Sequence, residues 1–237
     1  MSTPKEDEMP QKPTVVIVGG HGKIALLTAP KLVAAGYAVE ALIRNPEHEA
    51  DVEAAGAQPR ILDVEGAETS ELAAAFAGAE AVVFSAGAGG GNPARTKAVD
   101  HEAAVRTMDA AAQAGVSRYV MVSYARSEVD IHTLDPQSSF YPYATAKHHA
   151  DNYLRGTELD YTILGPGALT TEPASGKIMV LDAEAAAATL SQGGPEASHT
   201  SRENVAEVIV HVLRAGAAVR QTVNFFDGTT PIAEAIA

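Results

Sequence analysis

The sequence contains no cysteine and no apolar run that approaches the length of a membrane-spanning helix. The absence of cysteine excludes disulfide bonds, thiolate nucleophiles and thiolate metal ligands. Basic residues are also scarce, because 17 lysines and arginines stand against 30 aspartates and glutamates, a formal net charge of -13 over 237 residues. We therefore expect no nucleic acid and no anionic membrane among the partners, since both attract positively charged surfaces.

The most informative stretch is an apolar run that breaks into glycines. Residues 15–18 are Val-Val-Ile-Val, and Gly19-Gly20-His21-Gly22-Lys23-Ile24-Ala25 follows them. The β-branched run predicts a buried parallel strand, and the glycines allow the backbone to turn tightly and approach a pyrophosphate at the start of the next helix. The spacing is a tight variant of the dinucleotide-binding fingerprint. Against the alternative of a structural loop, we predict a dinucleotide site formed by Gly19, Gly20, His21, Gly22, Lys23 and Ile24.

The end of the next predicted strand, residues 38–43, indicates which dinucleotide binds. About 20 residues beyond the glycines, the fingerprint places the side chain that contacts the adenosine ribose, and the sequence there reads Arg44-Asn45-Pro46. An acidic residue would accept from the ribose hydroxyl of NAD, whereas a guanidinium binds a 2′-phosphate through charge-assisted hydrogen bonds. Arg44 and Asn45 thus favour NADP over NAD, with Lys23 as a second positive charge. The alternative is that Arg44 merely ends a strand in solvent.

Two further strand ends are expected to meet the same ligand, because ligands of a doubly wound sheet lie across the carboxyl edge of its strands. Asp63 and Val64 follow the predicted strand 58–62 and are placed for the adenine, although Asp63 is equally suited to cap a helix. Ser85, Ala86 and Gly87 begin a run of small residues, 85–91, after the predicted strand 80–85. That run lets the pyrophosphate and the nicotinamide ribose pass close to the backbone, or else it is only a flexible loop.

The strongest catalytic signal is Tyr143-Ala144-Thr145-Ala146-Lys147, within a predicted helix over 143–155. Side chains four apart share one helix face, so the ammonium of Lys147 can lower the pKa of the Tyr143 phenol and hold ribose hydroxyls. Ser123 follows the predicted strand 118–122 and places a hydroxyl at the floor of the same site. We expect no metal site, because the adjacent His148 and His149 point in different directions and lack a third ligand.

Along the chain, strand and helix patterns alternate without a break in composition. Further helices are predicted over 22–35, 47–55, 70–77, 94–114 and 202–215, and further strands over 160–164 and 221–226, with a loop-rich stretch over 165–200 and a terminal helical turn. Pro30 should kink or shorten the first helix, and Ser201 should cap the helix that follows it. Residues 1–13 are polar, acidic and rich in proline, which predicts a disordered tail rather than a signal peptide. Residues 14–237 therefore form one α/β domain with a doubly wound parallel sheet, and we expect it to be soluble and cytoplasmic.

Residues 14–228 resemble the short-chain dehydrogenase/reductase superfamily, in particular its atypical NAD(P)-binding subgroup close to the extended, epimerase/dehydratase-like members. The resemblance rests on the glycine motif, Arg44-Asn45-Pro46, Asp63-Val64, Val122-Ser123, Tyr143 with Lys147, residues 159–163, Pro166-Gly167 and residues 201–206. It implies a Rossmann domain with strand order 3-2-1-4-5-6-7, a nicotinamide cofactor, and a small C-terminal substrate-binding segment. The substrate would lie under the loops 124–142 and 165–200. By the same resemblance, Pro166 and Gly167 pass beside the nicotinamide, and Tyr143, Lys147 and Ser123 are the catalytic residues.

Three positions depart from the superfamily pattern. Ser123 is followed by Tyr124 and Ala125, which puts the expected serine hydroxyl one place early. Asp100 stands where extended members often carry an asparagine, and an ionised Asp accepts hydrogen bonds but does not donate them. Gly165 replaces the arginine that commonly precedes the Pro-Gly pair. These departures are typical of relatives that bind the cofactor with an incomplete active site.

The sequence thus predicts an NADP-dependent oxidoreductase-like protein that transfers hydride to or from a small carbonyl or alcohol substrate. Two alternatives remain open. One is a regulatory protein that senses NADP(H) without turnover, and the other is an NAD(P)-dependent epimerase or dehydratase. The expected partner is a small molecule of unknown identity, and the expected state is a monomer or a homodimer.

Overall fold

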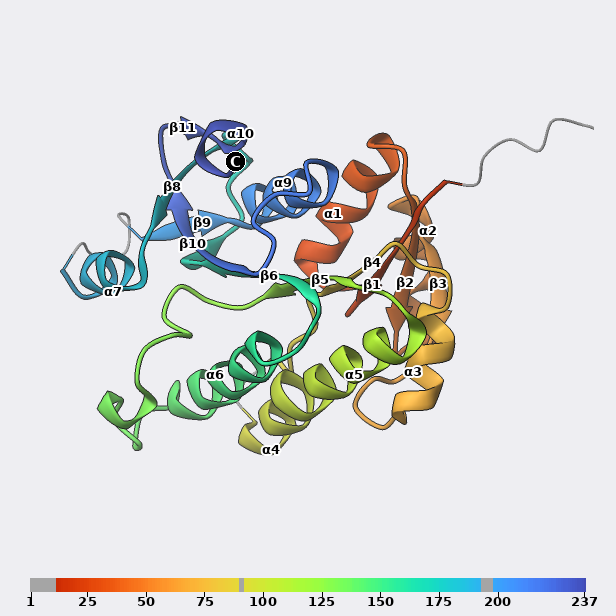
Figure 1. The fold of residues 1–237 in the computed structure, drawn as a ribbon, viewed down its shortest axis with the longest axis horizontal. Helices are drawn as coiled ribbons and strands as arrows, with labels where there is room; N and C mark the ends of the chain where they lie inside the picture. The colour runs from red at the N-terminus through yellow and green to blue at the C-terminus, as the bar shows by residue number, and fades with distance from the viewer. Residues whose placement is uncertain (1–11, 90–91, 193–197) are drawn as a thin grey trace, which may run out of the picture.

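A single sheet with helices on both faces forms the centre of the computed structural model, which describes residues 12–89, 92–192 and 198–237 (Figure 1). Most of the predicted disordered tail, residues 1–11, lies outside the described residues, as do Gly90, Gly91 and residues 193–197. The sheet has nine strands in the described residues, in the order β11-β8-β10-β6-β5-β4-β1-β2-β3. Its parallel strands are β1 (Thr14–Val18), β2 (Ala38–Ile43), β3 (Gln58–Ile61), β4 (Ala81–Phe84), β5 (Arg118–Val122), β6 (Asp160–Pro166) and β10 (Gln221–Asp227). With β10 as the seventh parallel strand, the predicted doubly wound fold and its strand order are confirmed.

The stretch 165–200, which we expected to be rich in loops, contains regular structure instead. It holds β7 (Ala168–Thr170), β8 (Lys177–Leu181), α7 (Ala183–Gln192) and β9 (His199–Ser201). Strand β8 pairs antiparallel with β10 and with β11 (Thr230–Pro231), whereas β7 and β9 form a separate parallel pair. The prediction failed here because β8 lies between β10 and the two-residue β11 and leaves Met179 and Val180 exposed, so its residues lack the continuous burial of a central strand.

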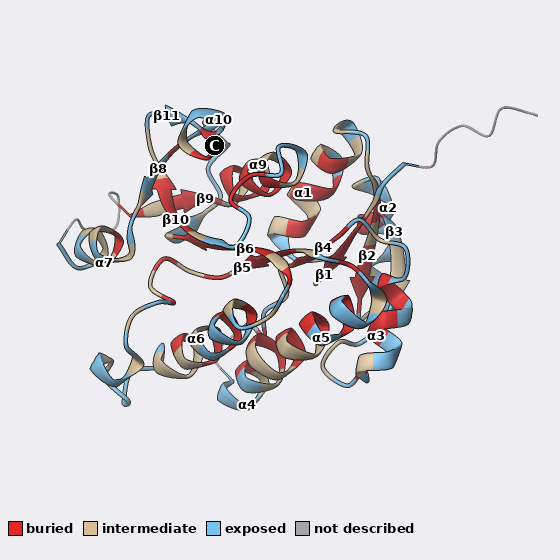
Figure 2. Cartoon of the chain, in the orientation of Figure 1, coloured by how far each residue is buried: buried red, intermediate tan, exposed pale blue. Residues whose placement is uncertain are grey.

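The helices divide between the two faces of the sheet, and the sheet itself is buried from both sides (Figure 2). One face is covered by α1 (Lys23–Ala34), α2 (Glu49–Ala54), α9 (Arg202–Arg214) and α10 (Ile232–Ala235). The other face is covered by α3 (Thr69–Phe76), α5 (Ala104–Ala114) and α6 (Tyr141–Arg155). The shorter helical segments are η1 (Pro46–His48), α4 (Pro93–Thr96), η2 (Lys97–Ala103) and η3 (Ile131–Thr133).

Three local predictions about helices have different outcomes. Helix α1 continues through Pro30 to Ala34, so the proline does not shorten it. Pro30 is exposed, and the backbone carbonyl that loses its partner there therefore stays close to solvent. The predicted helix over 94–114 is instead α4, the π-helical η2 and α5 in succession. Ser201 caps α9 as expected, because its side chain accepts hydrogen bonds from the backbone of Glu203 and Asn204.

Candidate functional site

A cleft of about 350 Å³ lies at the carboxyl edge of β1, β2, β3 and β4. It contains most of the predicted cofactor-binding residues, which lie on four different loops: Gly19, Gly20, His21, Gly22, Arg44, Asn45, Asp63, Val64, Ser85, Ala86 and Gly87. Five predicted residues do not line it, namely Lys23, Ile24, Lys147, Pro166 and Gly167. The topology therefore brings together the residues that follow the first four parallel strands.

The turn between β1 and α1 has the geometry of a phosphate cradle. Gly19 has a positive φ of +83°, and a Cβ on Gly19 would come within 2.6 Å of the Cα of Ala86. A Cβ on Gly20 would lie 2.5 Å from the Cβ of Ala41. Glycine is therefore required at both positions for the turn to pack between β2 and the loop after β4. Helix α1 then begins at Lys23, and its N-cap residue Gly22 lines the cleft and offers no side-chain cap, so no capping side chain satisfies the amides of the first turn, and the start of the helix fits an anionic pyrophosphate.

At the other end of the cleft, two arginines meet one glutamate. Arg44 places Nη1 3.5 Å from Oε2 of Glu65, and Arg95 places Nε 3.5 Å from the same oxygen. Asp63 accepts a hydrogen bond of 3.1 Å from the backbone N–H of Glu65, so this aspartate caps the turn that carries Glu65 while it lines the cleft. Asn45 caps η1 by accepting from the backbone N–H of Glu47.

Two histidines lie together near the glycine turn. The rings of His21 and His48 stack with centroids 3.6 Å apart and an interplanar angle of 12°. His21 Nε2 also lies 2.8 Å from Oδ2 of Asp51. Sequence reasoning missed His48, Glu65 and Arg95, because none of them belongs to a recognised motif and each enters the cleft only through the tertiary fold.

A second cleft, of about 270 Å³, adjoins the first through Gly87. Tyr143 and Asp100 both line it. Phe140 also lines it, with its ring centroid 5.4 Å from that of Tyr143, and the Tyr124 ring packs 5.5 Å from the Tyr143 ring. Tyr143 therefore lines a cleft that adjoins the cleft at the glycine turn.

Lys147 is buried and faces the strands rather than Tyr143. Its Nζ donates a 2.8 Å hydrogen bond to the carbonyl of Val122 and contacts the sulfur of Met121 at 3.4 Å. Burial raises the pKa of Tyr143, and the nearby Asp100 and Asp151 raise it further. The expectation that Lys147 lowers the pKa of Tyr143 is therefore wrong for this structure, because burial and the two carboxyls dominate at the phenol.

Asp151 is a buried residue that sequence reasoning missed. Ser123 Oγ donates a 2.5 Å hydrogen bond to Oδ2 of Asp151, and Asp100 accepts one of 3.0 Å from the backbone of Ala88. Burial raises the pKa of both carboxyls, and the ammonium of Lys147 opposes that rise. The available signal was spacing, since Asp151 lies four residues after Lys147 on one helix face. Because the Ser123 proton is held by Asp151, it is not free to bond a substrate carbonyl.

The Pro-Gly pair at the end of β6 has a packing role. The backbone N–H of Gly167 donates to Thr200 Oγ1 at 2.9 Å, and a Cβ on Gly167 would lie 1.9 Å from the carbonyl oxygen of Ser198. The departure at Gly165 is also explained by packing. A Cβ on Gly165 would lie 2.3 Å from Oδ1 of Asn224, so the arginine of the superfamily pattern does not fit here.

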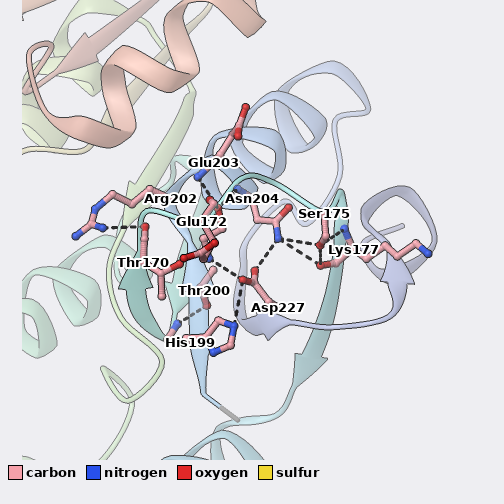
Figure 3. A network of polar contacts seen from close by, with 12 residues as sticks. Thr170, Glu172, Ser175, Lys177, His199, Thr200, Arg202, Glu203, Asn204 and Asp227 are labelled. Atoms are coloured by element: carbon pink, nitrogen blue, oxygen red, sulfur yellow. Dashed lines mark hydrogen bonds and ion pairs between the residues drawn. The ribbon is translucent and has the colours of Figure 1, made fainter. Parts of the chain in front are cut away.

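The segment between β7 and β8 is held to the start of α9 by a polar network around Asp227 (Figure 3). Asp227 accepts hydrogen bonds from the Asn204 side chain at 2.6 Å and from the Ser201 backbone at 2.9 Å. His199 Nε2 lies 3.7 Å from the same carboxyl, and Ser201 Oγ donates to the carbonyl of Glu172 at 2.5 Å. None of these residues lines either cleft, so the network fixes the predicted substrate-side segment without forming the site.

Residues 19–215 match the NAD(P)H-binding family. The chain belongs to this family. It is 33% identical over 228 residues to the uncharacterized sugar epimerase YhfK of Bacillus subtilis, covering 94% of this chain and 98% of that protein.

Two solved structures share the fold of this family member over most of its length. One is a candidate NAD-dependent epimerase/dehydratase of Bacillus halodurans, with a TM-score of 0.79, 29% identity and coverage of 94% of this chain and 97% of that one. The other is the oxidoreductase ylbE of Lactococcus lactis, with a TM-score of 0.77, 27% identity and coverage of 94% of both chains.

Two further findings concern the described part of the chain. None of its helices has the length and apolar composition needed to cross a membrane. No three His, Asp or Glu side chains in it lie close enough together to hold a metal ion.

Proposed function

We propose that this NAD(P)H-binding protein is an NADP-dependent oxidoreductase that acts on a small carbonyl or alcohol substrate. The observation that carries the proposal is the junction of the two clefts at Gly87, with Tyr143 lining the smaller one. The cofactor would be held by the uncapped start of α1 and by Arg44, and it supplies hydride transfer when bound. The volume of the second cleft, about 270 Å³, suits a small substrate.

In this proposal, Tyr143 holds the proton that the substrate oxygen receives. Because burial raises the pKa of Tyr143, the phenol is protonated at neutral pH and serves as a general acid in the direction of reduction. The Tyr124 and Phe140 rings pack beside it and limit the access of water. Lys147 is the candidate for a ribose contact, which requires its ammonium to leave the carbonyl of Val122.

A second candidate function, an NADP(H) sensor without turnover, is supported by the way two of the proposed catalytic groups are engaged. The proton of Ser123 is donated to Asp151, and the ammonium of Lys147 is bonded to the Val122 carbonyl. Neither group is free to act on a substrate in this arrangement. The epimerase/dehydratase alternative is supported by the descriptions of the relatives from Bacillus subtilis and Bacillus halodurans.

One set of measurements separates these functions. One sample of the purified protein is denatured to identify any dinucleotide that it releases. The folded protein is titrated with NADPH and NADH, and then mixed with NADPH and a panel of small aldehydes, ketones and nucleotide sugars. Loss of NADPH absorbance with any of the carbonyl compounds supports the oxidoreductase. Tight NADPH binding without turnover supports the sensor, and conversion of a nucleotide sugar without net cofactor oxidation supports the epimerase. Failure to bind either dinucleotide overturns all three.

A further inference from the structure

Two guanidinium groups from distant parts of the sequence converge on one carboxylate oxygen inside the larger cleft. Arg44 follows β2 and Arg95 lies in α4, yet both are 3.5 Å from Oε2 of Glu65. Of the three side chains, Glu65 is the least exposed, at 30% against 56% for Arg44 and 37% for Arg95. Two positive charges held this close repel each other unless an anion lies between them. The protein therefore supplies its own anion at the adenosine end of its candidate cofactor cleft.

The backbone of Glu65 is fixed independently of this carboxylate. Arg106 Nη2 donates to the carbonyl oxygens of Glu65 at 2.9 Å and of Val64 at 3.1 Å. The Glu65 N–H is bonded to Asp63. The carboxylate can thus leave the two arginines by side-chain rotation alone, while the loop that carries it stays in place. A neutral side chain at position 65 would leave all of these backbone bonds intact.

We propose that Glu65 reduces the preference for NADP over NAD by occupying the position of the 2′-phosphate between Arg44 and Arg95. This inference rests on the proposed cofactor site. A phosphate monoester carries a charge of about -1.5 to -2 at pH 7 and displaces the singly charged carboxylate from the two arginines. The ribose hydroxyl of NAD carries no charge, so Glu65 stays between the arginines and accepts a hydrogen bond from that hydroxyl.

The consequence is a cofactor preference smaller than that of a pocket with two unpaired arginines. NADP binding includes the cost of separating Glu65 from Arg44 and Arg95, whereas NAD binding does not. Position 44 carries no acidic residue that could accept a hydrogen bond from the ribose. Glu65, in the loop after β3, takes that role instead. The motif around Arg44 alone points to NADP, and Glu65 moderates that preference.

The test compares Glu65→Gln with the unaltered protein by isothermal titration at constant pH and salt. Adenosine 2′,5′-bisphosphate and adenosine 5′-monophosphate are the first probes, because they differ only in the 2′-phosphate, and NADPH and NADH follow. In Glu65→Gln the 2′-phosphate no longer has to break two exposed ion pairs before it reaches the arginines. Binding of the bisphosphate and of NADPH should therefore tighten roughly fivefold. Loss of the charged acceptor should weaken binding of the monophosphate and of NADH roughly tenfold. Arg95→Gln should weaken NADPH binding and leave NADH binding nearly unchanged.

The matched control is Glu80→Gln, which removes the same charge from an exposed position just before β4, at the opposite edge of the sheet from the cleft. It should leave the ratio of NADPH to NADH affinity unchanged. An unchanged ratio in Glu65→Gln, or a shift equal to that of the control, overturns the role of Glu65. If the unaltered protein prefers NADH but Glu65→Gln still shifts the ratio towards NADPH, the role of Glu65 stands and the NADP preference fails.

Discussion

Ser123 and Asp151 are joined by a hydrogen bond of 2.5 Å between Oγ and Oδ2, beneath the carboxyl end of β5, where Asp151 is completely buried. Asp151, Asp100 and Lys147 are all buried, so two carboxyls face a single ammonium in a region of low polarity. An isolated buried carboxylate is costly, and it lowers that cost by retaining a proton. The two buried carboxyls beneath Tyr143 therefore favour their protonated forms, and this makes the stability of the fold depend on pH.

The first prediction concerns Asp151→Asn and the pH dependence of stability. Because burial raises the pKa of Asp151 above 3.8 in the folded state, the folded protein binds the proton more tightly than the unfolded chain does. The stability of the unaltered protein relative to the variant should therefore fall as the pH rises from 3.8 through the raised pKa. The slope should reach at most about 1.4 kcal/mol per pH unit.

Urea unfolding of both proteins between pH 4 and pH 8 measures this difference. Asp135→Asn, at an exposed loop position, controls for the loss of one negative charge. A difference between Asp151→Asn and the unaltered protein that does not change with pH would contradict the assignment. Asp100 and Lys147 face the same region, so the full pH profile of each protein is needed.

The second prediction separates binding from folding in the glycine turn. A Cβ on Gly22 would lie 3.1 Å from the carbonyl oxygen of Gly19 and 3.7 Å from that of Ser85, so the unliganded fold accommodates Gly22→Val with a small shift. The branched side chain would occupy the approach to the uncapped start of α1. We expect Gly22→Val to abolish the increase in melting temperature that NADPH gives, while the unliganded protein stays folded.

Gly20→Ala is the contrasting variant. Its added Cβ would lie 2.5 Å from the Cβ of Ala41, and overpacking of this kind costs about 1–3 kcal/mol. Gly20→Ala should therefore lower the melting temperature of the unliganded protein itself. A full NADPH shift in Gly22→Val would show that the pyrophosphate does not bind at this turn.

The third prediction tests Arg44. Arg44→Asp removes a charge-assisted contact to a 2′-phosphate and should raise the dissociation constant of NADPH about tenfold to a hundredfold. NADH binding should be spared, because its ribose carries no phosphate. Titration of both cofactors against both proteins measures the effect. Equal loss of NADPH and NADH affinity would mean that Arg44 supports the cleft without selecting the cofactor.

The fourth prediction concerns Tyr143. If the protein is an oxidoreductase, Tyr143→Phe removes only the proton donor, so turnover should fall by about two to four orders of magnitude while NADPH affinity is retained. Tyr124→Phe keeps the neighbouring ring and removes the adjacent hydroxyl, and it should have a much smaller effect. A sensor predicts that Tyr143→Phe changes nothing beyond a small effect on cofactor binding. Turnover that is unaffected by Tyr143→Phe would remove this residue from the mechanism.

The parts of the fold that sequence predicted are those in which local pattern and tertiary structure agree. The run Val15 to Val18 is buried throughout, and the glycines after it fit contacts with Ala41 and Ala86 that admit no side chain. The order of the parallel strands followed from the resemblance and from the alternation of strand and helix. Strand β8 was missed because only Ile178 among its residues is buried, so it lacks the continuous apolar burial of the central strands.

The parts of the site that sequence could not predict are those assembled from separate loops. Glu65 and Arg95 are ordinary charged residues in the sequence, and only the return of the chain to one edge of the sheet places them beside Arg44. The direction of the Lys147 side chain was also beyond reach, because its spacing from Tyr143 fixes the helix face but not the partner. The hydrogen bond to Val122 depends on how closely α6 packs against β5.

The two outermost strands of the sheet have a consequence for association. Strand β3 contains Pro59, and β11 consists of Thr230 and Pro231, so each margin lacks an N–H at a position where a neighbouring strand would need one. A further strand added at either margin would form an interrupted ladder. Both margins are thereby protected against the growth of a continuous intermolecular sheet, the route by which exposed strands aggregate.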